Sequence, residues 1–156
     1  MIRKMRILAY FLILNMTFSS KASLQEVRVI DGDSLVIENK KYRLFGIDAP
    51  EMQQICLDKM SKVKCGVLSR KVLVNQIKNK SVNCKKITTD RYKRIVADCF
   101  IEANKSLSSY MVKNGYAFAY RRYSDQFVQD EEYAKLNQLG LWKMKFDFPW
   151  DYRKKN

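Results

Sequence analysis

Apolar residues near the start of the chain follow the short alternating runs that are typical of β-strands. Residues 25–30, 34–38 and 41–47 are rich in Val, Ile, Leu and Tyr, and the breaks between them contain Asp, Gly and Asn. These breaks, Asp31-Gly32-Asp33 and Asn39-Lys40, favour tight turns between antiparallel strands. The pattern therefore predicts three strands joined by turns.

The periodicity changes at residue 61, where Val63, Val67, Val74 and Ile77 recur at helical spacing with Lys and Arg between them. This spacing predicts an amphipathic helix over 61–78 with a basic exposed face.

The strand pattern returns on both sides of a polar turn at 90–93, and two helical segments follow, each ending near a glycine that favours a helix C-terminus. The predicted elements are strands over 82–87 and 94–101 and helices over 106–113 and 125–139. The chain is long enough for one domain, predicted over 23–156, and its elements favour the α+β class: a five-stranded OB-fold-like β-barrel with about three helices. The aromatic tail, residues 142–156, either packs back on the core or lies free of it.

The first 22 residues have the pattern of a secretory signal peptide. Arg3, Lys4 and Arg6 precede an apolar run over 7–18, and small residues follow at Ser20 and Ala22. Cleavage is expected before Ser23 or nearby, so we expect a secreted or periplasmic protein with no stable membrane span after processing. The alternative is an uncleaved anchor, which the run disfavours because it is shorter than the roughly 20 residues that cross a bilayer.

All four cysteines, Cys56, Cys65, Cys84 and Cys99, follow the predicted signal peptide. An even number in an exported chain favours two disulfides. Cys84 and Cys99 lie at equal distances from the turn at 90–93, so they face each other in an antiparallel hairpin and are expected to pair. Cys56 would then pair with Cys65 and close a short basic loop between a strand and a helix. A zinc site would need closely spaced cysteines, usually with histidine, and the sequence has neither.

The charge of the chain favours a polyanionic partner. Thirty Lys and Arg against sixteen Asp and Glu give a formal net charge of +14, which attracts nucleic acid or anionic lipid. A cationic membrane-surface protein is the weaker alternative, because the 61–78 helix has a modest valine stripe in place of a bulky aromatic and leucine face. The chain has no histidine, so the usual general base and the usual transition-metal ligand are both excluded.

Four carboxylates lie at the ends of predicted strands: Asp31, Asp33, Asp48 and Glu51. Pro50 stops the strand before it and keeps Ala49 extended. Hard oxygen ligands without histidine or thiolate suit Ca²⁺ or Mg²⁺. The alternative is that these acidic residues only cap turns and keep them soluble.

Arg43 is a candidate anion-binding residue. Strand alternation places it on the same face as Phe45 and Ile47, where a permanent charge needs a partner. A carboxylate would satisfy it, and so would a phosphate, which matches the guanidinium fork. Arg94 opens the strand after the turn and could serve in the same way, although taken alone it resembles an ordinary surface base.

Three segments together resemble the signature segments of the staphylococcal nuclease family. They are Val29-Ile30-Asp31-Gly32-Asp33-Ser34, Tyr42-Arg43-Leu44-Phe45-Gly46-Ile47-Asp48-Ala49-Pro50-Glu51 and Thr89-Asp90-Arg91-Tyr92-Lys93-Arg94. The similarity extends from about Val27 to Trp142, and three motifs in register are specific where one would be weak. Ser34 stands where the family usually has threonine, and Lys93 where glycine is common.

The resemblance implies a role for each matching residue. Asp33, Asp48 and the main-chain carbonyl of Ala49 would bind Ca²⁺, and Glu51 would act on the attacking water. Arg43 and Arg94 would hold the scissile phosphate, and Tyr92 would lie beside the nucleotide. The resemblance also implies hydrolysis of DNA and RNA that leaves 3′-phosphate ends, and two disulfides in exported members.

Aromatic residues alternate with arginines after Gly115, and they could stack on bases. The aromatic residues are Tyr116, Phe118, Tyr120 and Tyr123, and the interleaved arginines are Arg121 and Arg122. Tyr120 and Arg121 are the candidates for substrate binding, whereas Phe118 and some of the tyrosines could instead belong to the core.

The sequence thus predicts an exported, monomeric, calcium-dependent endonuclease of low sequence specificity. The alternative is a non-catalytic OB-fold module that binds nucleic acid. The joint presence of Arg43, Arg94 and the three acidic residues Asp33, Asp48 and Glu51 argues against that alternative.

Overall fold

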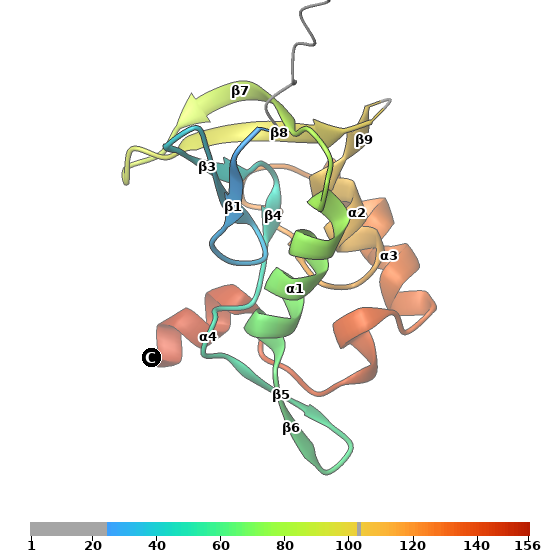
Figure 1. Ribbon diagram of the computed structural model, residues 1–156. Helices are drawn as coiled ribbons and strands as arrows, with labels where there is room; N and C mark the ends of the chain where they lie inside the picture. Colours follow the sequence, from blue (N-terminus) through green and yellow to red (C-terminus); the bar gives the residue numbers. More distant parts are fainter. Residues whose placement is uncertain (1–24, 103) are drawn as a thin grey trace, which may run out of the picture.

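The computed structural model describes residues 25–102 and 104–156. The predicted signal peptide over 1–22 lies outside these residues, so its cleavage and the domain boundary at 23 stay predictions. Three antiparallel pairings and one parallel pairing connect the strands of the main sheet, which lie in the order β1-β2-β3-β8-β7 (Figure 1). Its strands are β1 (Val27–Val29), β2 (Ser34–Ile37), β3 (Lys40–Leu44), β7 (Asn83–Thr89) and β8 (Ile95–Ile101), with the short β9 (Lys105–Ser106) paired to β8.

This five-strand path confirms the predicted α+β class and the OB-fold-like sheet. The predicted helices are present as α1 (Cys65–Ile77), α2 (Leu107–Lys113) and α3 (Val128–Leu136). A 3₁₀-helix, η1 (Gly140–Lys143), and a further helix, α4 (Pro149–Lys155), follow them.

The helix predicted over 61–78 is wrong at its start and in part of its apolar face, because Val67 and Val74 are exposed while Leu73 and Ile77 are buried. Residues 61–64 form strand β6 (Ser61–Lys64), which pairs with β5 (Ile55–Asp58) as a separate hairpin, and α1 begins only at Cys65. Val63 faces Cys56 across this hairpin, so its apolar character belongs to strand pairing. Because valine fits a strand as readily as a helix, the spacing of Val63 and Val67 could not locate the boundary.

The strand predicted over 41–47 is interrupted. Gly46 has φ +71°, a conformation that glycine adopts easily, and it separates β3 from the short β4 (Ile47–Asp48). β4 leaves the main sheet and pairs with β10 (Phe118–Ala119). This break carries Asp48 away from the line of β3.

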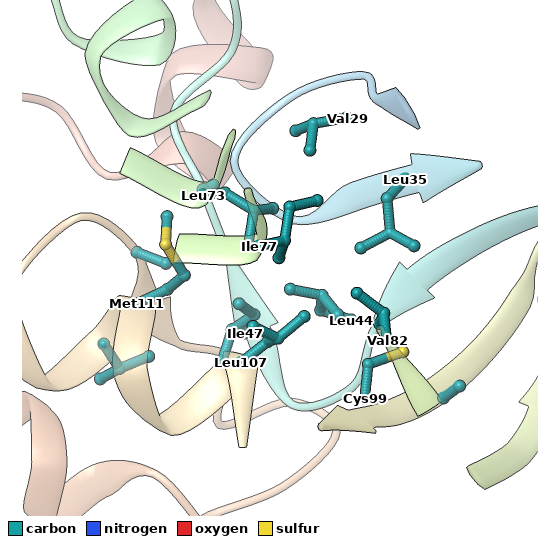
Figure 2. Close-up of a cluster of buried hydrophobic side chains, with 14 of the residues drawn as sticks. Val29, Leu35, Leu44, Ile47, Leu73, Ile77, Val82, Cys99, Leu107 and Met111 are labelled. Atoms are coloured by element: carbon teal, nitrogen blue, oxygen red, sulfur yellow. The ribbon is translucent and has the colours of Figure 1, made fainter. Parts of the chain in front are cut away.

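The main core fills the space between the sheet and the first two helices. Figure 2 shows Leu35 and Leu44 of the sheet beside Leu73 and Ile77 of α1. Each of these side chains is at least nine-tenths buried, and at about 1.5–3 kcal/mol per large apolar side chain such burial is the main stabilising term.

A second, aromatic core surrounds Phe118, whose side chain is fully buried. Its ring contacts those of Trp142, Phe146, Phe148 and Trp150 at centroid distances of 4.9 to 6.4 Å. The tail therefore packs back on the domain, which decides between the two alternatives left open by the sequence. Phe118 is therefore a core residue, which was one of the two alternatives that the sequence left open for it.

Both predicted disulfides are present: Cys84–Cys99 joins β7 to β8, and Cys56–Cys65 joins β5 to the first residue of α1. Cys84 and Cys99 are direct partners in the hairpin register, although a bulge lies between Lys86 and Thr88. The loop that Cys56 and Cys65 close is itself the β5–β6 hairpin. Among the described residues, no helix combines the length and the apolar composition needed to cross a bilayer.

Candidate functional site

Two acidic loops meet at one point because a glycine lets them approach. Gly32 lies between Asp31 and Asp33, and a Cβ on it would come within 2.0 Å of the Ser69 hydroxyl oxygen and 2.7 Å of the Ala49 Cβ. The backbone N–H of Ala49 donates to Asp33 Oδ2 at 2.7 Å. The loop before β2 is thereby fastened to the residue that follows β4.

Arg43 connects the two predicted metal ligands. Its Nη1 donates to Asp33 Oδ1 at 2.5 Å and its Nη2 to Asp48 Oδ1 at 2.6 Å. The two carboxylates are almost inaccessible, with exposed side-chain fractions of 1% for Asp33 and 0% for Asp48. The predicted convergence of the first two segments is therefore present, and Arg43 occupies its centre.

Burial makes this cluster electrostatically costly. Desolvation raises the pKa of Asp33 to about 8, and the nearby Asp31 and Asp48 carboxylates add to the rise, whereas the Arg43 guanidinium and the Ala49 N–H oppose it. Burial disfavours the charge on Arg43, but Asp33 and Asp48 more than compensate and raise its pKa. The Arg43 charge therefore does not outweigh the effect of burial on the pKa of Asp33.

Glu51, the predicted base, is positioned by its backbone. A Cβ on Gly66 would lie 1.9 Å from the Glu51 carbonyl oxygen, so α1 can pack on this loop only with glycine there. The fully buried Gln54 accepts the Glu51 N–H at 3.2 Å, and its own N–H donates back to the Glu51 carbonyl at 2.8 Å. The Glu51 side chain remains 43% exposed, which leaves its carboxylate accessible to solvent.

Arg94 directly precedes β8 and is held by the turn before it. Its Nε donates to Asp90 Oδ2 at 2.7 Å, and its backbone N–H donates to Asp90 Oδ1 at 2.9 Å. Val96, two residues later, is the register partner of Arg43, so alternation places Arg94 on the Arg43 face of the sheet.

Asp90 holds Arg94 in place, and the available signal for this role in the sequence was an Asp at the start of a polar turn. Partial burial opposes its ionisation, but hydrogen bonds from Arg94 and Tyr92 lower the pKa of Asp90 below its usual range. The exposed Tyr92 ring has the guanidinium carbons of Arg91 and Arg94 at 4.9 and 5.4 Å from its centroid.

Arg153 of α4 is the most informative residue that sequence reasoning missed. Its Nη2 donates to Asp48 Oδ2 at 2.6 Å, and its Nη1 donates to Glu51 Oε1 at 2.8 Å. Burial disfavours its charge, but the hydrogen bonds and charges of these two carboxylates raise its pKa. The available signal was the tail itself, whose aromatic residues indicate docking and whose Arg153 lies one helical turn after Trp150.

An open pocket of about 400 Å³ adjoins these residues, lined by Tyr120, Arg122, Trp150, Arg153 and Lys154. The ring of Tyr120 stacks on that of Trp150 at 5.6 Å with an interplanar angle of 4°. Three cations and two aromatic rings are the side chains that stacked bases and phosphates require.

The other aromatic and basic candidates have different surroundings. Arg121, proposed for substrate binding, forms an ion pair with the buried Glu131 at 2.6 Å and does not line the pocket. Tyr116 packs against both cores, and Tyr123 is exposed with its ring edge-on to Tyr120 at 5.0 Å.

The acidic residues of the site are candidate ligands for a divalent cation. Within residues 25–102 and 104–156, no cluster of three or more acidic, histidine or cysteine side chains is gathered closely enough to hold a metal ion. Asp33 and Asp48 nevertheless converge on the same guanidinium, are buried, and offer only hard oxygens. Carboxylate oxygens that converge on one point, with neither histidine nor thiolate beside them, are the ligands that Ca²⁺ or Mg²⁺ prefers, so the residues fit such an ion.

Comparison with known proteins identifies the family. The model of the family described as "Staphylococcal nuclease homologue" matches residues 41–144, which include Arg43, Asp48, Glu51 and Arg94. The matched region begins after Asp33 and ends before α4, so Arg153 lies outside it.

The names of individual relatives differ. The chain is 32% identical over 143 residues to an "Uncharacterized endonuclease" of Haemophilus influenzae, an alignment that covers 87% of this chain and 75% of the relative. It is 28% identical over 142 residues to the "Succinoglycan biosynthesis protein ExoI" of Rhizobium meliloti, covering 88% and 73% of the two chains. It is also 32% identical over 125 residues to the "Probable staphylococcal-like nuclease CAN3" of Oryza sativa subsp. japonica, covering 78% of this chain and 30% of that longer protein. On the family match and these identities, the chain belongs to the staphylococcal nuclease family.

Proposed function

We propose that the protein is an exported, calcium-dependent endonuclease that hydrolyses DNA, RNA or both with low sequence specificity and leaves 3′-phosphate ends. Membership of the staphylococcal nuclease family supports nuclease activity. The observation that carries the finer proposal is the Arg43 bridge between the buried Asp33 and Asp48, because it brings two potential cation ligands and one phosphate-binding group together.

The proposed mechanism follows from the charge of the substrate. A phosphodiester is already anionic and gains further negative charge on its phosphoryl oxygens in the transition state, so positive groups aimed at those oxygens lower the barrier. Arg43 and Arg94 would supply two guanidinium groups from one face of the sheet. Tyr92, beside Arg94, would contact the nucleotide.

Asp33, Asp48 and the carbonyl of Ala49 would hold Ca²⁺. When bound, the ion would polarise the phosphoryl oxygen and favour ionisation of a nearby water. Glu51 would accept the proton from the attacking water, since the chain has no histidine and this carboxylate is solvent-accessible.

The substrate path is proposed to continue into the pocket beside Tyr120. Arg122 and Lys154 would contact phosphates there through charge, and Tyr120 would support base stacking. Contacts of this kind do not read base edges, which supports low sequence specificity. Arg121 is also expected to bind substrate, but its ion pair with Glu131 would first have to break.

Export is proposed from the N-terminal pattern, and the two disulfides support an oxidising compartment. The mature chain is proposed to be a monomer.

A chelator-controlled digest tests the proposal. Purified protein is incubated with plasmid DNA and with RNA in Ca²⁺, in Ca²⁺ plus excess chelator, and after the ion is restored. We expect cleavage with Ca²⁺, loss with chelator and recovery on restoration, and the fragments should need phosphatase treatment before a polymerase extends their 3′ ends. Cleavage that ignores the chelator would refute the cation assignment, and binding without cleavage in any divalent ion would favour the non-catalytic OB-fold module.

A further inference from the structure

Arg153 holds the carboxylate oxygens that the proposed function needs. Besides its bonds to Asp48 Oδ2 and Glu51 Oε1, its Nη1 lies 3.2 Å from Asp48 Oδ1. Asp48 is thus shared by two guanidinium groups, because Arg43 also donates to Oδ1. One arginine comes from the sheet and the other from the C-terminal helix.

The position of Arg153 is built into the fold. The Trp150 ring, one turn before it, lies between Phe148 and Tyr120, nearly parallel to both at 4.7 and 5.6 Å. The side-chain amide Nε2 of the buried Gln54 donates to the carbonyl oxygen of Asp147 at 2.7 Å and ties the tail to the Glu51 loop. Figure 1 shows α4 beside the segment that joins β4 to β5. The docking of α4 therefore places the Arg153 guanidinium beside Asp48 and Glu51.

Burial makes this arginine compete with a cation. Asp48 has no exposed side-chain area, so its charge is poorly screened by water, whereas the Arg153 side chain is 39% exposed. A divalent ion binds carboxylate oxygens at about 2.3 to 2.6 Å, close to the separation that the Arg153 nitrogens already have. Two positive groups on the same oxygens repel each other.

The Arg153 side chain lies beside open space into which it can move away from Asp48 and Glu51. It lines the open pocket shared with Tyr120, Arg122, Trp150 and Lys154, so a change of side-chain conformation can move the guanidinium into that space while α4 stays docked.

We propose that Arg153 is a positioning residue that holds Asp48 and Glu51 in the cation-free enzyme and gives up these carboxylates when a divalent cation binds. Its charge thereby lowers cation affinity. While the ion pair lasts, Glu51 is directed towards Arg153 and is less available to accept a proton from water. This inference rests on the proposed function, because it assumes a cation site that includes Asp48.

A merely structural Arg153 predicts the opposite effect. If it only fastened α4, its loss would loosen the Glu51 loop and weaken cation binding. If it competes with the cation, its loss removes a repulsive charge and strengthens binding. The sign of the change therefore distinguishes the two roles.

The test is a calorimetric titration with Ca²⁺ in the absence of nucleic acid. Arg153→Met should bind Ca²⁺ about tenfold more tightly than the wild type, since one adjacent positive charge is lost. Arg153→Lys keeps the charge and should stay near the wild type. Lys155→Met is the matched control, because Lys155 lies on the same helix and pairs with Asp147 at 2.8 Å, and it should change the affinity less than twofold. Thermal unfolding checks each variant, and Arg153→Gln replaces Arg153→Met if the latter does not fold.

Asp48→Asn separates failure of the inference from failure of the proposed function. If the wild type binds Ca²⁺ and Asp48→Asn does not, the cation site stands, and an Arg153→Met affinity equal to or weaker than the wild type overturns the competition alone. If no variant binds Ca²⁺ or Mg²⁺, the proposed cation site fails and this inference fails with it.

Discussion

Asp48 and Glu51 are three residues apart, yet their environments differ. Asp48 is fully buried between Arg43 and Arg153, whereas the Glu51 side chain is 43% exposed and pairs with Arg153. Burial suits a carboxylate that must hold a charge in a fixed place, because low dielectric strengthens its interactions. Exposure suits a carboxylate that must meet water. The difference supports ligand and base as separate roles.

Replacing Glu51 by Gln should lower kcat by roughly 10² to 10³, because the variant keeps its shape but cannot accept a proton. The melting temperature should change little, since the side chain is half exposed. Digest rates and thermal unfolding would be measured beside Glu132→Gln, an exposed carboxylate on α3 that should leave both unchanged. Full activity in Glu51→Gln would assign the base elsewhere.

At the scale of elements, the two disulfides support different parts of the molecule. Cys84–Cys99 crosses β7 and β8 in the main sheet, and a separate network around Asp90 holds the turn that carries Arg94. Cys56–Cys65 anchors the first residue of α1, next to Gly66, which packs on the Glu51 backbone. Of the two bridges, the second therefore adjoins the loop that carries Glu51.

Removing either bridge by a double Cys→Ala change should lower the free energy of unfolding by about 2–4 kcal/mol. The effect on catalysis should differ. The Cys84/Cys99 variant should keep the kcat of the wild type at a temperature where it is folded, while the Cys56/Cys65 variant should lose several-fold because the Glu51 loop loses its support. Denaturant unfolding and initial digest rates measure the two effects. Equal kcat losses in both variants would contradict this division.

At the scale of the whole molecule, folding buries a carboxylate that resists ionisation. Asp33 has a pKa of about 8 in the folded protein, against an ordinary value of 3.8, mainly because folding removes water from it. A carboxyl group with the higher pKa in the folded state favours folding while it is protonated. That contribution is present at low pH and is lost as the pH rises towards the folded value.

The free energy of unfolding of the chelated protein should therefore decline as the pH rises from about 4 to about 8. The Asp33→Asn variant, which cannot ionise there, should show a flatter dependence. Denaturant unfolding of both proteins in excess chelator measures the two slopes. Added Ca²⁺ should restore stability to the wild type at about pH 8, because the ion binds the folded state. Identical slopes would show that Asp33 does not titrate in this range.

The sequence by itself was sufficient for features that depend on neighbouring residues. Alternation and turn residues predicted the main strands, and the symmetry of the Asp90 turn predicted the Cys84–Cys99 bridge. The proximity of Asp33 and Asp48 followed from the family resemblance, in which both motifs serve one site. Short-range patterns carry this information because hairpin register and turn geometry are local.

Only the tertiary structure decided the features that depend on distant parts of the chain. The burial of Phe118 depends on an aromatic tail that packs from elsewhere in the chain, and the hairpin that precedes Cys65 is itself bridged to that tail through Leu57 and Lys145. Arg153 reaches Asp48 across 105 residues, because the aromatic stack docks α4 beside the Glu51 loop. The pattern of neighbouring residues does not specify such contacts, because apolar burial is non-directional and brings together any surfaces that fit.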